Sequence, residues 1–278
     1  MERGPRLPHL ILSEKSNIKA GVGALFIPGL EILDIPIYMY MEFMSWLPAF
    51  VERHKSLSTI TFNGDQYNFR WSQNPDILFP LQFRDAVESL DRTVSLNGFS
   101  ISRTGSASLD TWRVTALELT LHTADGISGL RLASALAPEL SSLVIRMSSD
   151  DSSRRPIPVD DLASALGCFP SLRRLNLHKI FQHLVFEGPA PWDSPPDADL
   201  NTSNCMIAHA ALHWIMARVA QCTPTLELVH GADQGYDGKG HLMHPWRLEA
   251  TYQVRRNFGL DFDETPHFII TDRFSQPR

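Results

Sequence analysis

The sequence predicts a mixed α/β fold in which short helix–strand units repeat and stack side by side. Two observations carry this prediction. The segment Leu-Ala-Ser-Ala-Leu occurs at residues 132–136 and again at 162–166, with its leucines at helical spacing. Each copy is followed by apolar residues spaced as in L-x-x-L-x-L, which suits a short strand with alternate side chains buried. Neither half can bury its apolar face alone, so stacked copies are expected.

The best-formed copy lies in the middle of the chain. Residues 162–169 predict a short amphipathic helix, and Pro170 ends it because proline lacks an N–H and its ring clashes with the preceding turn. The strand that follows has the buried positions Leu172, Leu175 and Leu177. The other elements are expected in order along the chain on the same pattern.

Residues 1–28 predict an irregular N-terminal cap or an incomplete first repeat. Strand patterns begin at residues 30, 57, about 91, 114, 140, 172 and about 223. Further helices are predicted at residues 39–54, shortened or kinked by Pro48, at 83–90 and at 207–219. Loop insertions are predicted near residues 65–77, 148–158 and 186–202. A C-terminal cap is predicted over 231–278, with a loop at 231–245, an edge strand at 248–254 and another strand at 268–270.

The intervals between copies decide the kind of fold. Most lie near the 20–29 residues of leucine-rich repeats, and the longer ones contain the insertions. The sequence therefore predicts a leucine-rich-repeat-like solenoid over residues 29–230, with a curved, mostly parallel sheet and outer helices. A doubly wound α/β domain is the alternative. That fold favours longer continuous apolar strands and a glycine-rich phosphate loop, and the sequence has neither.

Composition bounds the class of protein. The chain is 43% apolar and 20% charged, which is typical of a globular protein. A net charge of −6 creates no field that attracts nucleic acid or an anionic membrane, so neither is predicted as a partner. The three cysteines, Cys168, Cys205 and Cys222, do not look like a disulfide framework and are predicted to be buried small hydrophobes, with Cys168 and Cys222 at helix ends facing a core. With no signal sequence or membrane-spanning run, an intracellular protein, cytoplasmic or nuclear, is expected.

The repeats also resemble a known family. The copy Phe169-Pro-Ser-Leu-Arg-Arg-Leu-Asn-Leu177, in which a helix ends in Phe-Pro before the strand, looks like the leucine-rich-repeat region of fungal F-box-like proteins. The segments Trp246-Arg-Leu-Glu-Ala-Thr-Tyr-Gln-Val254 and Pro266-His-Phe-Ile-Ile270 resemble the C-terminal ends of those chains. The resemblance covers roughly residues 25–271.

In that family an N-terminal F-box docks the adaptor of a cullin-type ubiquitin ligase, and the repeats hold the protein to be ubiquitinated. Here residues 6–12 match only the Leu-Pro of an F-box start, so the F-box is not visible in this chain. The resemblance implies a substrate-recognition region, with the adaptor as partner if an F-box lies upstream. A stand-alone repeat scaffold is the alternative.

Metal ligation offers an enzyme alternative. His209 and His213 lie at i and i+4 on a predicted helix, which is zinc-ligand spacing, but Ala210 stands where a metalloprotease has glutamate. This pattern favours ordinary helix histidines over a metal-dependent hydrolase. A second group is predicted to lie in a polar surface loop without the ligand series of a calcium site: His230, Asp233, Asp237, His241 and His244. No hydrolase or nucleotide-binding motif is present, so no catalytic residue, cofactor or metal is predicted.

The remaining candidate is a binding surface. In a repeat solenoid, residues between the buried strand positions point to the concave sheet face, where protein partners usually bind. The residues predicted to contact a partner are Asp34, Thr61, Glu118, Arg146, Arg174, Asn176 and His178. Their charge changes from acidic and neutral to basic along the chain, which suits an acidic partner segment. A solvated sheet face without a partner is the alternative.

Overall fold

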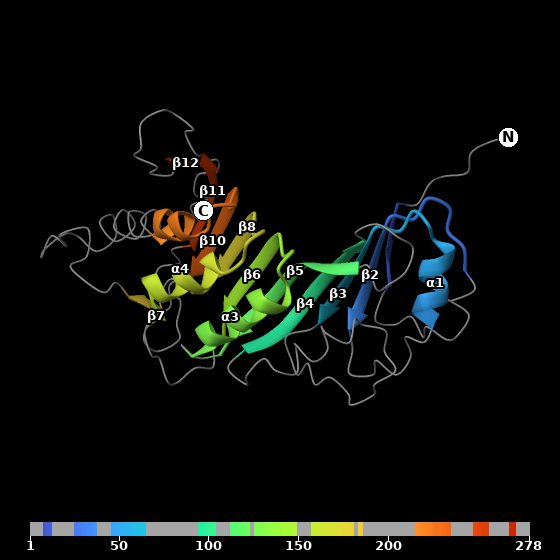
Figure 1. Ribbon diagram of the computed structural model, residues 1–278, viewed down its shortest axis with the longest axis horizontal. Coiled ribbons are helices and arrows are strands. Elements are labelled where there is room, and N and C mark those ends of the chain that lie inside the picture. Colours follow the sequence, from blue (N-terminus) through green and yellow to red (C-terminus); the bar gives the residue numbers. More distant parts are fainter. Residues whose placement is uncertain are drawn as a thin grey trace, which may run out of the picture. The chain divides into compact units, whose positions relative to one another are not determined.

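The computed structural model describes residues 8–12, 25–37, 46–64, 94–103, 112–122, 125–148, 157–180, 183–185, 215–234, 247–255 and 267–270. They form a mixed α/β structure with a mostly parallel sheet and a few helices (Figure 1), which confirms the predicted class at that level. Two compact units make up the chain, residues 1–119 and 120–278. The predicted elements at 65–77, 83–90 and 186–202, and the first part of the helix at 207–219, lie outside the described residues.

The first unit is built on strands. In order across its sheet they are β1 (His9–Ile11), β2 (Ile32–Ile37), β3 (Thr59–Gly64), β4 (Val94–Arg103) and β5 (Trp112–Leu121), of which residues 120 and 121 already belong to the second unit. β1, β2 and β3 run parallel, whereas β4 runs antiparallel to β3. β4 therefore departs from the parallel repeat that the sequence predicts. An antiparallel partner needs no crossover that returns the chain to the same end of the sheet.

Helix α1 (Leu47–Arg53) lies within the predicted helix at residues 39–54, of which 39–45 lie outside the described residues. Pro48 lies in its first turn, where a helix loses nothing from the missing N–H. Phe50 and Val51 are buried with the strand residues of this unit, among which Leu33 and Phe62 are fully buried. The ring of Phe62 stacks on that of Phe99 at a centroid distance of 4.6 Å, which ties β3 to β4 on the core side.

The second unit has strands β6 (Ser142–Met147), β8 (Arg174–His178), β10 (Leu228–Gln234), β11 (Arg247–Arg255) and β12 (His267–Ile270), in that order across its sheet. β6, β8 and β10 run parallel, and β11 and β12 follow antiparallel. Its helices are α3 (Gly126–Leu136), α4 (Val159–Gly167) and residues 215–222. A separate pair joins β7 (Ile157–Pro158) to β9 (Leu184–Val185).

The two Leu-Ala-Ser-Ala-Leu helices and their strands are confirmed. The segments lie in α3 and α4, which neighbour each other in Figure 1. The predicted strand positions of these two copies are fully buried: Leu140, Leu143, Ile145, Leu172, Leu175 and Leu177. The apolar sides of the helices and strands thus form the core of this unit.

The predicted C-terminal cap is wrong in two details. Residues 231–234, predicted as loop, continue β10, because β11 supplies hydrogen-bond partners for their backbone. Residues 248–254, predicted as an edge strand, lie in β11 between β10 and β12. Tyr252 in this strand is fully buried, as a residue of an interior strand can be.

One backbone turn recurs in both units. The N–H of a leucine donates to the carbonyl oxygen three residues earlier at five places in the described residues: Leu30, Leu57, Leu140, Leu172 and Leu226. Each of these leucines is at most 2% exposed. The turn therefore places a buried leucine just before a strand and satisfies its N–H locally.

A second contact follows the turn and joins neighbouring copies. Two consecutive N–H groups donate to a single carbonyl oxygen of the preceding copy. The pairs are Ser58 and Thr59 to Glu31, Arg173 and Arg174 to Ser141, and Glu227 and Leu228 to Arg173. Each copy thereby fixes the register of the next through main-chain atoms.

Hydroxyl groups reinforce the same junction. The Ser56 hydroxyl donates to the Leu30 carbonyl, and the Thr225 hydroxyl donates to the Leu172 carbonyl, both at 2.8 Å. Each hydroxyl belongs to the residue directly before a turn leucine, and each acceptor is the turn leucine of the preceding copy. The two units therefore use the same side-chain contact at equivalent positions.

Close packing between two helices of the second unit explains a glycine. A Cβ on Gly167, the last residue of α4, would lie 2.6 Å from the Cys222 carbonyl oxygen, so only glycine fits without displacement. At the start of α4, Asp160 forms an ion pair with Arg218 of the helix at residues 215–222. The hydrogen bond to Asp160 and its charge raise the pKa of Arg218 above the ordinary value.

Buried His54 closes one of the repeated turns in the first unit. It is 1% exposed, and its Nε2 accepts the Ile27 N–H at 2.9 Å, so Nδ1 carries the proton and donates to the Phe50 carbonyl at 2.8 Å. Its ring stacks on those of Phe26 and Phe50, with centroid distances of 5.4 and 4.0 Å. The imidazole therefore joins the backbone at Ile27 to the backbone at Phe50, and its ring packs on the rings of Phe26 and Phe50.

Burial of Tyr252 gives a testable pH dependence, because burial raises the pKa of its phenol to about 12. An ordinary tyrosine has a pKa of about 10, so the folded state holds this proton more tightly than the unfolded chain does. We expect its contribution to be complete below pH 10 and to be lost as the pH rises to 12, with a fall of about 1 kcal/mol by pH 11. Urea unfolding of wild type and Tyr252→Phe at pH 9 and pH 11 measures this, and equal pH dependence in both proteins would contradict it.

Candidate interaction surface

Polar side chains gather on the side of the first unit's strands that faces away from its buried residues. We call this set the polar face of the first unit; it consists of His9, Asp34, Thr59, Thr61, Ser100, Ser102 and Thr115. All of them are exposed or half-buried. The strand register explains their alignment, because Asp34 lies opposite Thr61 and Thr61 lies opposite Ser100.

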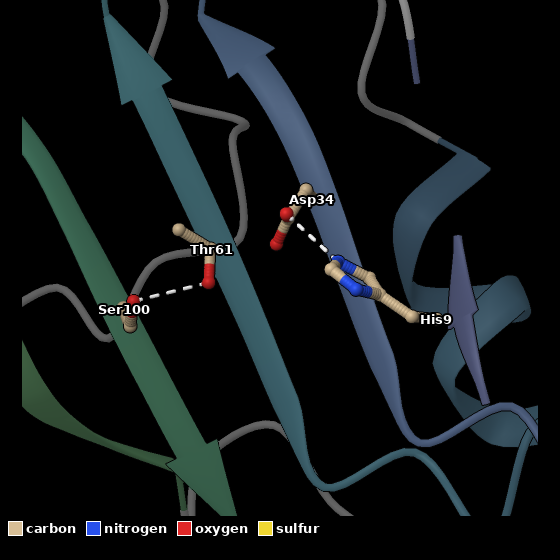
Figure 2. A network of polar contacts seen from close by, with 4 residues as sticks. All are labelled: His9, Asp34, Thr61 and Ser100. Carbon is tan, nitrogen blue, oxygen red and sulfur yellow. Dashed lines mark hydrogen bonds and ion pairs between the residues drawn. The ribbon is translucent and has the colours of Figure 1, made fainter. Parts of the chain in front are cut away.

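Hydrogen bonds connect these side chains across the strands. His9 Nε2 lies 2.8 Å from Asp34 Oδ2, and Thr61 Oγ1 lies 3.1 Å from Ser100 Oγ (Figure 2). One row further along, Ser102 Oγ lies 2.9 Å from Thr115 Oγ1. The Asp34 side chain is 19% exposed and that of His9 is 43% exposed. This face therefore presents one carboxylate, one imidazole and a row of mutually bonded hydroxyls.

The second unit has a different polar face. It is formed by the strand residues that alternate with the buried ones, namely Ser142, Val144, Arg146, Arg174, Asn176, His178, Leu228, His230, Ala232, Thr251 and Gln253. Arg146 lies opposite His178 in the register. Asn176 lies opposite His230, which lies opposite Thr251.

His230 contacts side chains on the two strands beside β10. Its Nδ1 lies 3.0 Å from Thr251 Oγ1, and its ring centroid lies 5.9 Å from that of His178. The positions that β6, β8 and β10 contribute to this face include two arginines and two histidines but no aspartate or glutamate. The arginines therefore make the part of this face on β6, β8 and β10 cationic, whereas the polar face of the first unit is neutral or weakly acidic.

The structure locates all seven residues predicted to contact a partner. Asp34 and Thr61 lie on the polar face of the first unit, and the residues on that of the second are Arg146, Arg174, Asn176 and His178. Glu118 lies on β5, half-buried between buried Leu117 and Leu119. Whether any of them binds a partner stays a prediction.

Sequence reasoning placed His230 in a loop and not on this face, because it assigned the last strand to Leu226 and Leu228. The buried residues are instead Leu226, Val229 and Gly231, so Leu228 and His230 point to the polar face. The spacing L-x-x-V-x-G was the available signal. His230 and Asp233, predicted in a loop, lie in β10.

The alternative ligands and cysteines are only partly described. His209, His213, Cys205, Asp237, His241 and His244 lie outside the described residues. Within the described ranges, no three His, Cys, Asp or Glu side chains are grouped as a metal ion requires. Cys168 follows α4 but is exposed, so the prediction that it faces the core is wrong; its thiol contacts the Ser164 carbonyl instead. Cys222 is half-buried.

None of the helices in the described part of the chain combines the length and the apolar character needed to cross a membrane. No family model matches the chain, and no curated protein matches it. The geometry of the two polar faces is therefore the basis for a functional proposal.

Proposed function

We propose that this chain is a non-catalytic protein-interaction module of leucine-rich-repeat-like form. The observation that carries the form is the turn with a buried leucine, repeated five times in the described residues. Stacked copies need such a turn, because each copy has to place an apolar residue in the core and align its strand with that of the next copy. The paired N–H contacts to the preceding copy support the same interpretation.

The two polar faces are the surfaces that we propose to contact the partner. Side chains on neighbouring strands are about 4.8 Å apart, and the hydrogen-bonded backbone holds them at fixed spacing. Binding to such a surface requires little ordering of the protein, which lowers the entropic cost of association. Repeat proteins use extended sheet surfaces of this kind to bind other proteins.

A photo-crosslinking experiment tests this assignment. A crosslinking amino acid is introduced at Thr61, at Asn176 or, as a control, at Ser164, which is exposed on helix α4 and not on a strand of either polar face. We expect another protein to be captured from the two polar-face positions and not from position 164. Equal capture from all three positions, or capture from position 164 alone, would show that the polar faces are not the contact surface.

The resemblance to F-box-like proteins supports a more specific role. We propose that the module is the substrate-recognition region of an F-box-like ubiquitin-ligase subunit, with a stand-alone repeat scaffold as the alternative. A pull-down with the purified cullin-ligase adaptor compares this chain with an upstream-extended form, if the gene encodes one. Adaptor binding by the extended form alone supports the ligase role. Binding by neither form overturns that role and leaves the scaffold.

A further inference from the structure

The cationic charge on the polar face of the second unit has a defined layout. Arg174 begins β8, and His178 ends the same strand four residues later. Arg146 of β6 lies opposite His178. Because a strand advances about 3.3 Å per residue, the level of Arg146 lies about 13 Å along the strands from that of Arg174. The side chains of Arg174 and Arg146 therefore leave the backbone at opposite ends of this face.

The middle of the face is formed by Asn176 of β8, the strand between β6 and β10. Asn176 lies halfway between Arg174 and His178, and His230 lies opposite it with its Nδ1 3.0 Å from Thr251 Oγ1. The Arg174 side chain is exposed and forms no hydrogen bond or ion pair with another residue in the described ranges. Its neighbour Arg173, in contrast, lies 3.4 Å from Glu227 in an ion pair. Arg174 is thus available to a ligand anion, whereas Arg173 is already paired within the chain.

An extended peptide matches this layout. Its side chains on one side repeat every two residues, or about 7 Å, so residues i and i+4 are about 13 Å apart. Two carboxylates on one side of such a peptide therefore match the separation of the two arginines along the strands. The net charge of −6 for the whole chain disfavours a long polyanion, whereas a short acidic segment meets only the local cationic face.

We infer that the polar face of the second unit binds an extended peptide segment with carboxylates at positions i and i+4, an inference that rests on the proposed interaction function. One carboxylate contacts Arg174, and the other contacts Arg146 beside His178. The guanidinium forks suit this role because they bind carboxylates through two parallel hydrogen bonds. The side chain at i+2 faces Asn176 and His230, which offer hydrogen-bonding groups.

Two synthetic peptides of equal composition test the spacing. Both are nine residues of Gly, Ser and Thr with two aspartates, at positions 3 and 7 in one peptide and at positions 3 and 4 in the other. Fluorescence anisotropy at low salt measures their binding to the full chain. We expect the first peptide to bind about tenfold more tightly than the second. Equal affinities, or no binding of either peptide at millimolar concentration, would overturn the inference.

Matched variants test the residues. Arg174→Gln and Arg146→Gln are each expected to weaken binding of the spaced peptide by about tenfold. Arg173→Gln is the control, because this exposed neighbour belongs to the alternate set of side chains and pairs with Glu227. An equal loss in the control variant would show a general charge effect and contradict the site. Melting temperatures equal to that of wild type establish that the variants compare binding and not folding.

A third probe and the crosslinking experiment separate the possible failures. If a single-stranded RNA oligonucleotide binds as tightly as the spaced peptide and loses affinity in Arg174→Gln, the face is a polyanion site and the inference is overturned. If position 176 captures a partner protein but neither peptide binds, the acidic segment is wrong while the interaction function stands. If position 176 also captures nothing, both proposals fail for this unit.

Discussion

Leu175→Asp is expected to prevent the second unit from folding at ordinary temperature. Leu175 is fully buried in the middle strand of three, opposite Leu143 on β6 and Val229 on β10. The new carboxylate would be buried without a cationic or hydrogen-bonding partner, which costs several kcal/mol or forces protonation. A loss of that size is a large part of the 5–15 kcal/mol by which domains are usually stable. Thermal unfolding followed by circular dichroism measures it.

Asn176→Asp is the matched control for this substitution. It adds the same charge at the next position of β8, where the side chain is half-buried on the polar face near Arg174 and His178. We expect its melting temperature to stay close to that of wild type. Equal melting of Leu175→Asp and wild type would show that β8 does not bury the side chains that the structure buries.

His54→Phe is expected to lower the free energy of unfolding of the first unit by about 2 kcal/mol, a cost typical of leaving buried polar groups unpaired. Phenylalanine keeps a ring that can stack on Phe50 but removes both nitrogens. The Ile27 N–H and the Phe50 carbonyl then lose a partner, at atoms that are wholly or partly buried. Urea unfolding at neutral pH measures the change.

His9→Phe is the corresponding control. His9 also donates a hydrogen bond, from Nε2 to Asp34 Oδ2, but its side chain is 43% exposed, so water can replace the lost contact. We expect this variant to change the free energy of unfolding by less than about 0.5 kcal/mol. If both variants lose the same stability, the effect of His54→Phe comes from histidine replacement in general and not from the buried hydrogen bonds.

The part of the fold that could be predicted was predicted mainly from the spacing of the leucines. Where all three buried positions of a copy are large and apolar, as in Leu172, Leu175 and Leu177, the predicted register is the observed one. The same register put Arg174 and His178 on the polar face. In the last copy the third buried position is Gly231, which has no apolar side chain. Leucine spacing therefore predicts Leu228 as a buried position, whereas the buried residue is Val229.

Strand direction and long-range pairing could not be predicted in this way. Alternation along β4 is the same whether the strand runs parallel or antiparallel to β3, so its sequence contains no signal for its direction. The contact between His230 and Thr251 joins strands whose pairing depends on the chain reversal after β10. Side-chain periodicity within one segment cannot reveal a neighbour that another segment supplies.

The paired N–H contacts between copies have an evolutionary consequence. The donors are Ser58 and Thr59 in one copy, Arg173 and Arg174 in another, and Glu227 and Leu228 in a third, so hydroxyl, cationic, acidic and apolar residues all occupy the same junction. Since the donors are main-chain N–H groups, any residue except proline can occupy these sites and keep the bonds. Selection can therefore alter the side chains that the surface presents, residue by residue, while the scaffold beneath them is inherited unchanged.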